Sequence, residues 1–359
     1  MTGQRILFAV HDWGLGHATR DLVLIRGLLE ANNEVVVLST GRALRLLQEE
    51  IGDRCELVEL RDIPKPLSRR PAAFYVKMSL ALPLVFATFV RERRFARALV
   101  ARKGIDRIVS DSRFGVALRE VPSYYVFHSL RQIIPGRPYY LEKMVECAQK
   151  GLLSRARRIL VPDEPENGLS GELAHDLSCD WGDRLRYIGA LSSVSAQAGQ
   201  TGVDYFISIS GAEPQRTLFE ERVLAQVADL PGRVVVALGK PDSETRKPDQ
   251  DRVVIYNYLN RQDQQAMMNR ARLVICRSGY TTLMELAQLH KPALFVPTPG
   301  QSEQEHLADY HCHRGHTYAV SQNDLDLPRD VAEAERYPGL PRIRPPEDSV
   351  RRFLDAISD

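Results

Sequence analysis

Two side chains in the first half of the chain stand where acid–base chemistry is expected. His17 follows the apolar run ILFAV and a short loop that contains Gly14 and Gly16, and Asp111 ends the run IDRIVSD. Catalytic groups of open parallel sheets collect at the carboxyl ends of the strands. An imidazole, with an unperturbed pKa near neutrality, suits a general base. We therefore expect His17 or Asp111 to take a proton, with Arg20 beside them.

Ordinary explanations remain for each of these residues. A histidine at the start of a helix can be a surface or capping residue, and Asp111 can cap the helix that follows it. A dinucleotide fingerprint is disfavoured, because Thr19 stands where a third glycine or an alanine belongs and the next strand, NEVVVLST, ends without an acid. His128 ends another apolar run, SYYVF, and we expect it at the same sheet edge, on the acceptor side with Gly14, Gly16 and Arg20.

A second constellation, residues 272–310, suits a phosphorylated ligand. The run LVIC ends in a turn, a 3.6-period segment follows, and Pro292 precedes the run ALFVP, which predicts strand, turn, helix and strand. Backbone N–H groups and the positive end of the helix dipole meet at such a turn. Similar turns and solvated glutamates also occur in parallel α/β proteins without a ligand. The candidate ligand-binding residues are Arg277, Ser278, Gly279, Tyr280, Glu285, Gln301, Gln304 and Glu305, with Gly211 in an earlier glycine-containing turn.

Alternating strands and helices predict the architecture that positions these residues. The 359 residues are enough for two α/β domains, each a doubly wound, Rossmann-like sheet, facing one another across a cleft. We expect the first domain in residues 1–195, on the acceptor side, and the second in residues 203–340, with the polar segment SSVSAQAGQTG as linker. A final amphipathic helix in residues 345–359 is expected to pack back on the first domain.

Composition excludes several classes of protein. A formal net charge of +2 gives no reason to expect nucleic-acid binding. Five scattered cysteines without a CxxC pair favour a reducing cytoplasm and argue against a disulfide framework. ILFAV is too short for a signal peptide. The spacing in HCHRGH, residues 311–316, fits no tetrahedral zinc site, so we expect no metal and no cofactor.

The stretch Met78–Val90 is almost wholly apolar and flanked by basic residues. It is too short, and too interrupted by Pro83, to span a bilayer. One interpretation is a buried helix at a core or domain edge. The other is a surface that enters an anionic bilayer, where a lipid-linked acceptor would lie. The flanking bases are Arg69, Arg70 and Lys77 before the stretch and Arg91, Arg93, Arg94 and Arg97 after it.

Two motifs resemble a known family. The run CRSGYTTLMELA followed by PALFVPTPGQSEQE resembles the donor-binding signature of the peptidoglycan N-acetylglucosaminyltransferase and its GT-B relatives, a glycosyltransferase family 28-like group. GLGHATRD resembles the GxGHxxR loop of GT-B glycosyltransferases and of a related UDP-sugar hydrolase. The resemblance implies a UDP-sugar donor, phosphate binding at Ser278 and Gly279, ribose binding at Glu285 and sugar binding at Gln304. A second glutamine of the family is Glu305 here.

The expected function is therefore sugar transfer, and the resemblance implies that it proceeds with inversion at the sugar carbon. The donor would be UDP-N-acetylglucosamine or a UDP-hexose, and the acceptor a lipid-linked or cell-envelope glycan. The expected location is the cytoplasm, at the inner face of the cell membrane. The alternatives are a UDP-sugar hydrolase of the same fold and a nucleotide-sugar-binding protein without catalysis.

Overall fold

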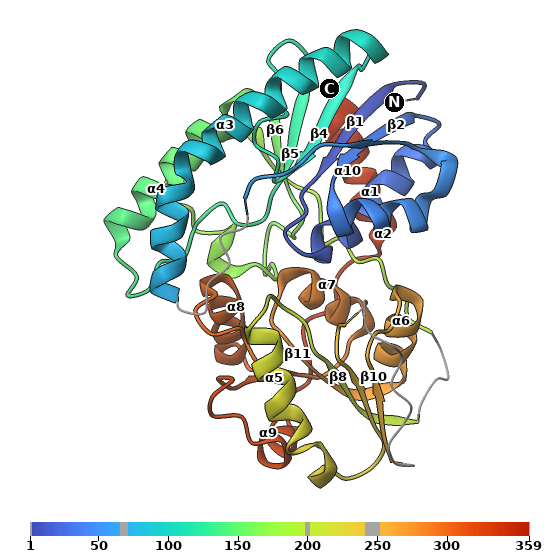
Figure 1. The fold of residues 1–359 in the computed structure, drawn as a ribbon, viewed down its shortest axis with the longest axis vertical. Helices are drawn as coiled ribbons and strands as arrows, with labels where there is room; N and C mark the ends of the chain where they lie inside the picture. The colour runs from blue at the N-terminus through green and yellow to red at the C-terminus, as the bar shows by residue number, and fades with distance from the viewer. Residues whose placement is uncertain (1, 65–70, 198–201, 241–251, 359) are drawn as a thin grey trace. The chain divides into compact units, whose positions relative to one another are not determined.

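The computed structural model describes residues 2–64, 71–197, 202–240 and 252–358, and of residues 71–79 it describes the backbone alone. The predicted linker therefore lies partly outside the described residues, as do Arg69, Arg70 and the side chain of Lys77. The chain forms two compact units (Figure 1). One holds the N-terminal strands and residues 344–359, and the other holds residues 194–343.

The first unit is built on a seven-stranded sheet in which every pairing is parallel, in the order β3-β2-β1-β4-β5-β6-β7. Runs such as ILFAV are buried along their whole length, as expected for strands covered on both faces. The register places Val10 opposite Asp111. The strands are β1 (Arg5–Val10), β2 (Glu34–Ser39), β3 (Glu56–Glu59), β4 (Arg107–Asp111), β5 (Ser123–Val126), β6 (Arg158–Val161) and β7 (Leu185–Tyr187).

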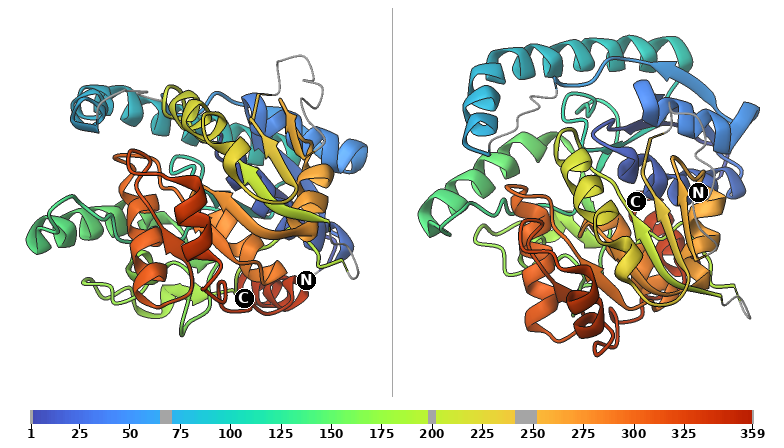
Figure 2. Two further views of the ribbon diagram at one scale, coloured as in Figure 1. Left: turned by 90° about the horizontal axis from the view of Figure 1, so that it is seen from below. Right: turned by 60° about the horizontal axis from the view of Figure 1, so that its bottom comes forward.

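Helices cover this sheet, and the last of them comes from the end of the chain. α10 packs on α1, and Figure 2 shows it, in red, returning to the unit that contains β1. Its backbone is tied down by Tyr124, whose hydroxyl donates to the Ile357 carbonyl at 3.0 Å. The helices are α1 (Leu15–Glu30), α2 (Gly41–Ile51), α3 (Pro71–Lys103), α4 (Tyr139–Leu152) and α10 (Pro346–Ser358).

The second unit repeats the plan with a parallel sheet in the order β10-β9-β8-β11-β12-β13. The predicted strand, turn, helix and strand are confirmed as β11, the turn at residues 277–279, α7 and β12. The strands are β8 (Val203–Ser208), β9 (Val234–Ala237), β10 (Val253–Tyr256), β11 (Ala271–Cys276), β12 (Ala293–Phe295) and β13 (Tyr318–Ala319). The helices are α5 (Gln215–Leu224), α6 (Arg261–Arg270), α7 (Tyr280–Leu289), α8 (Ser302–His313) and α9 (Leu327–Ala334).

The expectation of unpaired cysteines is wrong for one pair. Cys147 in α4 and Cys179 form a disulfide, with a Cα–Cα distance of 6.1 Å across a sequence separation of 32 residues. Nearby, the buried Glu146 carboxylate accepts hydrogen bonds from the Cys179 N–H and the Trp181 indole. The two cysteines meet because the chain folds back along α4, which their spacing in the sequence does not reveal.

Candidate active site

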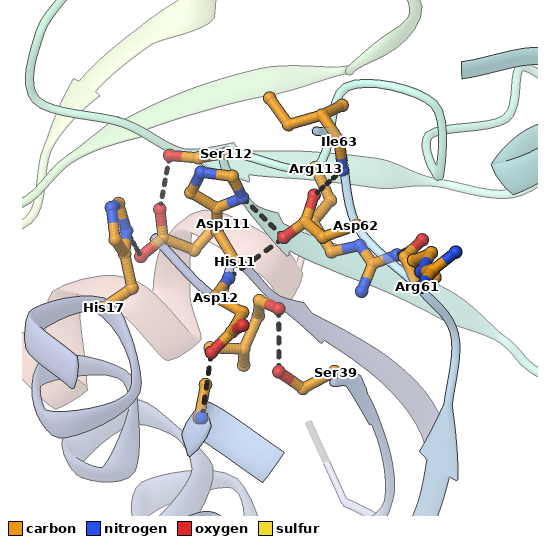
Figure 3. Close-up of polar contacts among 12 residues, drawn as sticks. His11, Asp12, His17, Ser39, Arg61, Asp62, Ile63, Asp111, Ser112 and Arg113 are labelled. Atoms are coloured by element: carbon orange, nitrogen blue, oxygen red, sulfur yellow. Dashed lines mark hydrogen bonds and ion pairs between the residues drawn. The ribbon is translucent and has the colours of Figure 1, made fainter. Parts of the chain in front are cut away.

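The carboxyl edge of the first sheet gathers titratable side chains from the ends of several strands. β1 leads through a short loop into α1, and Gly14 allows this turn because its φ of 90° is strained for any residue with a Cβ. Gly16 and His17 lie in the first turn of α1. β4 ends beside β1 at Asp111. His17 and Asp111 are therefore brought together, as shown in Figure 3.

His17 and Asp111 form a hydrogen-bonded pair. The distance from His17 Nδ1 to Asp111 Oδ2 is 2.9 Å, and Asp111 is fully buried. Arg20 Nη2 lies 3.0 Å from the same Nδ1, but it already donates to Asp111 at 2.6 Å. We assign the proton to Nδ1, because the Asp111 carboxylate can only accept. Nε2 then carries a lone pair, and none of the described residues forms a hydrogen bond with it. The His17 side chain is 20% exposed, so a ligand can reach this nitrogen.

Electrostatics keep this imidazole neutral. Burial lowers the pKa of His17 to about 4; the charge of Asp111 opposes this shift and that of Arg20 adds to it. Burial alone would raise the pKa of Asp111, but Arg20 and His17 hold it well below its usual value. At neutral pH, His17 is therefore an uncharged base, and the ionised Asp111 orients its ring.

Arg20 and His128 belong to the frame of this site. The Arg20 guanidinium donates to Asp111 Oδ2 from Nε at 2.9 Å and to Oδ1 from Nη2 at 2.7 Å. Its Nη1 lies 3.0 Å from His128 Nδ1. Arg20 is 1% exposed and His128 is 6% exposed. Both were predicted to face an acceptor, but the structure buries both side chains. Arg20 packs against Asp111 and compensates the carboxylate charge, and His128 contacts Arg20.

A second imidazole–carboxylate pair, His11 with Asp62, was not predicted from the sequence. His11 Nδ1 lies 2.6 Å from Asp62 Oδ2, and the side chains are 6% and 3% exposed. The His11 and His17 ring centroids are 5.2 Å apart, with the rings nearly perpendicular (Figure 3). The sequence contained one indication of this pair, because His11 directly follows the strand β1. Asp62 follows β3, which is two strands away, and only the sheet order brings it close.

The turn after β11 is shaped by backbone rather than by charged side chains. Gly279 is the N-cap of α7, so no side chain caps this helix. The buried Ser278 hydroxyl donates to the Gln304 carbonyl at 2.7 Å, and Gln304 Oε1 accepts from the Thr298 N–H at 2.8 Å. These bonds join the turn to the start of α8. Tyr280, the first residue of α7, is buried.

Arg277 does not have the geometry of a phosphate ligand. It is 2% exposed, and its guanidinium donates to the carbonyls of Val296 and Gln215 at 2.9 and 3.0 Å and to Gln322 Oε1 at 2.6 Å. Its guanidinium also stacks on Phe219, 4.3 Å from the ring centroid. We therefore assign it a structural role in the wall of the turn.

The remaining predicted residues of the second unit differ in their surroundings. Burial raises the pKa of Glu285 to about 7, with a small opposing effect of Arg261. Glu305 Oε1 accepts from the Gly300 N–H at 2.8 Å, and Gln301 is exposed just before α8. Gly211 has a φ of +114°, and a Cβ there would lie 3.7 Å from Thr298 Oγ1.

The histidine-rich segment forms a pair and not a metal cluster. His311 Nδ1 lies 3.1 Å from His316 Nδ1. Among the described residues, no group of three or more histidine, cysteine or acidic side chains is arranged to hold a metal ion.

Comparison with known proteins agrees with this arrangement. Residues 210–336 match the glycosyltransferase family 28 C-terminal domain. The chain is 25% identical over 342 residues to the UDP-N-acetylglucosamine–N-acetylmuramyl-(pentapeptide) pyrophosphoryl-undecaprenol N-acetylglucosamine transferase of Corynebacterium efficiens, covering 91% of this chain and 86% of that protein. The corresponding protein of Histophilus somni is 46% identical over 57 residues, 16% of each chain.

Solved structures show the same fold along the whole chain. The glycotransferase of kitacinnamycin superposes with a TM-score of 0.67 at 16% identity, covering 99% of this chain and 96% of that one. MurG of Acinetobacter baumannii superposes with a TM-score of 0.55 at 12% identity, covering 98% and 99%. The chain is thus a glycosyltransferase of the GT-B fold with a family 28 C-terminal domain, and it resembles the peptidoglycan N-acetylglucosaminyltransferases.

Proposed function

We propose that the protein transfers a sugar from a UDP-sugar to a hydroxyl group of a lipid-linked or cell-envelope acceptor, with inversion at the sugar carbon. The observation that carries this proposal is the neutral His17 imidazole, whose Nδ1 is held by Asp111 and whose Nε2 has no partner among the described residues. The similarity to the Corynebacterium efficiens transferase, whose name states such a donor and acceptor, supports it.

The reaction balances with the groups present. The acceptor oxygen attacks the anomeric carbon, its proton passes to His17 Nε2, and the bond from that carbon to the diphosphate oxygen breaks. The electron pair leaves with UDP. We propose that the N-terminus of α7 at Gly279 and Tyr280, rather than a metal ion, stabilises the charge that develops on the diphosphate. Asp111 orients the imidazole and stabilises the imidazolium that forms.

Donor recognition is assigned to the second unit. We propose that Glu285 binds the ribose hydroxyls, that Gln304 and Glu305 read the sugar, and that Gly211 and Ser278 let the diphosphate approach the backbone. We propose UDP-N-acetylglucosamine or another UDP-hexose as the donor, because Glu305 stands where the family has a second glutamine and the sugar is therefore not fixed by the resemblance.

Replacing Glu285 by glutamine should weaken UDP-sugar binding and stabilise the free protein. The folded state holds the pKa of Glu285 at about 7, above its usual range, so burial of the carboxylate costs stability as pH rises from about 4.5 to about 7. At pH 8 we expect the variant to gain about 1 kcal/mol in free energy of unfolding and to bind donor roughly 10-fold more weakly. Urea unfolding and calorimetric titration measure the two effects.

Glu221→Gln is the matched control, because Glu221 lies exposed on α5 of the same unit. It should change neither quantity. If Glu285→Gln is no more stable than the native chain at pH 8, or binds UDP-sugar equally well, the assigned role is wrong.

The acceptor assignment rests on α3. Of the two interpretations of Met78–Val90 we propose the surface one, because Leu82, Leu84 and Phe86 are 45%, 58% and 59% exposed, although Val85 and Phe89 are buried. The helix continues through Pro83 to Lys103 and presents Arg91 and Arg94 beyond the apolar stretch. No described helix is long and apolar enough to cross a membrane. We propose that this surface enters an anionic bilayer and meets a lipid-linked acceptor there.

Replacing both Leu82 and Phe86 by aspartate should reduce binding to vesicles that contain phosphatidylglycerol by more than 10-fold. Each apolar side chain contributes on the order of 1.5–3 kcal/mol when it leaves water. Co-sedimentation with vesicles measures the binding. Leu218→Asp is the control, since Leu218 is 46% exposed on α5 of the other unit. Equal vesicle binding by the double variant and the control would contradict the membrane contact.

The decisive test of the function uses a panel of UDP-sugars without acceptor, following thermal stability and UDP release. A transferase should be stabilised by one donor and release little UDP until an acceptor in vesicles is added. Rapid release with free sugar would make the protein a UDP-sugar hydrolase. Stabilisation with no release under any condition would favour a nucleotide-sugar-binding protein, and no stabilisation by any UDP-sugar would contradict the uridine assignment.

A further inference from the structure

His11 is oriented in the same way as the proposed base but has no place in the mechanism so far. Asp62 Oδ2 accepts from the Asp12 N–H at 2.9 Å, and Oδ1 accepts from the Ile63 N–H at 2.7 Å. Burial would raise the pKa of Asp62, but its bond and charge interaction with His11 hold it well below its usual range. Asp62 is thus a carboxylate, and His11 Nδ1 must carry the proton that joins them at 2.6 Å.

The second ring nitrogen of His11, Nε2, has no role in the interactions described so far. None of the described residues forms a hydrogen bond with His11 Nε2. Asp62 already receives two backbone N–H groups, so the loop after β3 does not need an imidazole to satisfy it. His11 Nε2 is not among the buried side-chain atoms that lack a partner, so this nitrogen keeps contact with solvent. The far nitrogen of His11 is therefore a candidate for ligand binding.

The two imidazoles are close enough to serve one ligand. Both belong to residues 11–17, between the end of β1 and the first turn of α1, and their ring centroids are 5.2 Å apart at an angle of 85°. Each has its Nδ1 occupied by a buried carboxylate, Asp62 or Asp111 (Figure 3). Each of the two neighbouring rings thus keeps its Nε2 for another partner. One attacking hydroxyl group needs only one base, but a second hydrogen-bond acceptor could bind a second O–H group of the same ligand.

We infer that His11 is a second hydrogen-bond acceptor in the nucleophile site, which therefore takes a nucleophile that presents two O–H groups. This inference rests on the proposed function. The hydroxyl that attacks gives its proton to His17 Nε2, and the neighbouring O–H donates to His11 Nε2. The two O–H groups belong either to a vicinal diol, as in a saccharide, or to one water molecule. Transfer would use the first and hydrolysis the second.

His11→Asn isolates this role. The amide Nδ2 of asparagine occupies the place of imidazole Nδ1 and can still donate to Asp62, while Nε2 is removed. His175→Gln is the matched control, because His175 pairs with the buried Asp163 in the same unit at 3.2 Å through its Nε2, the position that a glutamine amide nitrogen can take, away from residues 11–17. Both variants should unfold at similar urea concentrations.

The first measurement needs no turnover. Long-range ¹H–¹⁵N correlation spectra of the full chain at pH 7 report which imidazole nitrogen carries a proton. The inference expects a signal, lost in His11→Asn, from an imidazole protonated at Nδ1 alone. A His11 ring protonated at Nε2 would overturn it, because that nitrogen could not accept. Since no donor is present, this result is independent of whether the protein uses a UDP-sugar.

The second measurement separates the two sources of the O–H pair. With the donor that the panel identifies, UDP release is compared in water alone, with cyclohexanol, and with trans-cyclohexane-1,2-diol. A diol site predicts that the diol accelerates release more than the alcohol does, and that His11→Asn removes this advantage by roughly 10-fold while the alcohol rate changes less than about twofold. A water site predicts the same loss in water alone.

If His11→Asn leaves both the diol advantage and the rate in water unchanged, the inference is wrong. If no UDP-sugar is turned over, the proposed function fails separately. The spectra then decide alone: the diol, and not the alcohol, must shift both the His11 and the His17 Nε2 signals.

Discussion

Replacing His17 by glutamine is expected to lower the rate of sugar transfer by about 100- to 10,000-fold, the usual contribution of a positioned general base. Glutamine keeps a polar side chain of similar length but cannot take a proton from a hydroxyl group. Donor binding should change less than about twofold, because the donor is assigned to the second unit. Transfer is measured as UDP release in the presence of acceptor, and donor binding by calorimetric titration.

His175→Gln is the control for this prediction. His175 also pairs with a buried aspartate, Asp163, and its side chain is 18% exposed against 20% for His17. The control should keep its rate within about twofold. A His17→Gln variant with the native rate would remove His17 as the base, and a variant that no longer binds donor would show that the substitution acts through the fold.

The pH dependence of the transfer rate is a second test of His17. The pKa of His17 is lowered to about 4, so the imidazole stays unprotonated through the neutral and mildly acidic range. The rate at saturating donor concentration, where the titration of the donor-binding Glu285 has no effect, should therefore be flat from about pH 8 to pH 5 and fall below that. Because the unfolded chain binds this proton at a higher pH than the folded one, the same shift reduces stability as pH falls from about 6.5 toward 4.

The chemistry of the site was predictable where sequence position and sheet position coincide. Asp111 ends β4 and His17 begins the helix that follows β1, and the register of Val10 against Asp111 places them at the same sheet edge. Asp62 shows the limit, because it follows β3 and reaches His11 only through the strand order β3-β2-β1. A sequence read along the chain contains no signal of that order.

The two arginines show a different limit. Arg20 and Arg277 stand beside predicted ligand sites, and an arginine at such a place suggests contact with substrate. Both are instead buried and saturated with protein acceptors, Arg20 by a carboxylate and Arg277 by carbonyls. Whether a guanidinium turns toward a ligand or into the protein depends on which acceptors the fold places behind it.

The largest effect on stability is expected from Arg20→Met. This change removes the charge that compensates Asp111 but keeps much of the packing volume, so a fully buried carboxylate is left without its main partner. Breaking a buried ion pair from one side costs about 3–5 kcal/mol. Both tryptophans of the chain, Trp13 and Trp181, belong to the first unit. Their fluorescence during urea unfolding therefore reports on the unit that contains the pair.

A double variant tests the cause of this loss. Adding Asp111→Asn to Arg20→Met removes the uncompensated charge, and we expect more than half of the lost stability to return, although His17 loses its orienting carboxylate and transfer stays slow. Arg216→Met is the control, because Arg216 pairs with Glu220 at 2.8 Å in the second unit. It should leave the tryptophan transition unchanged. A loss below about 1 kcal/mol for Arg20→Met, or no recovery in the double variant, would mean that the charge of Asp111 is compensated elsewhere and that Arg20 acts mainly by packing.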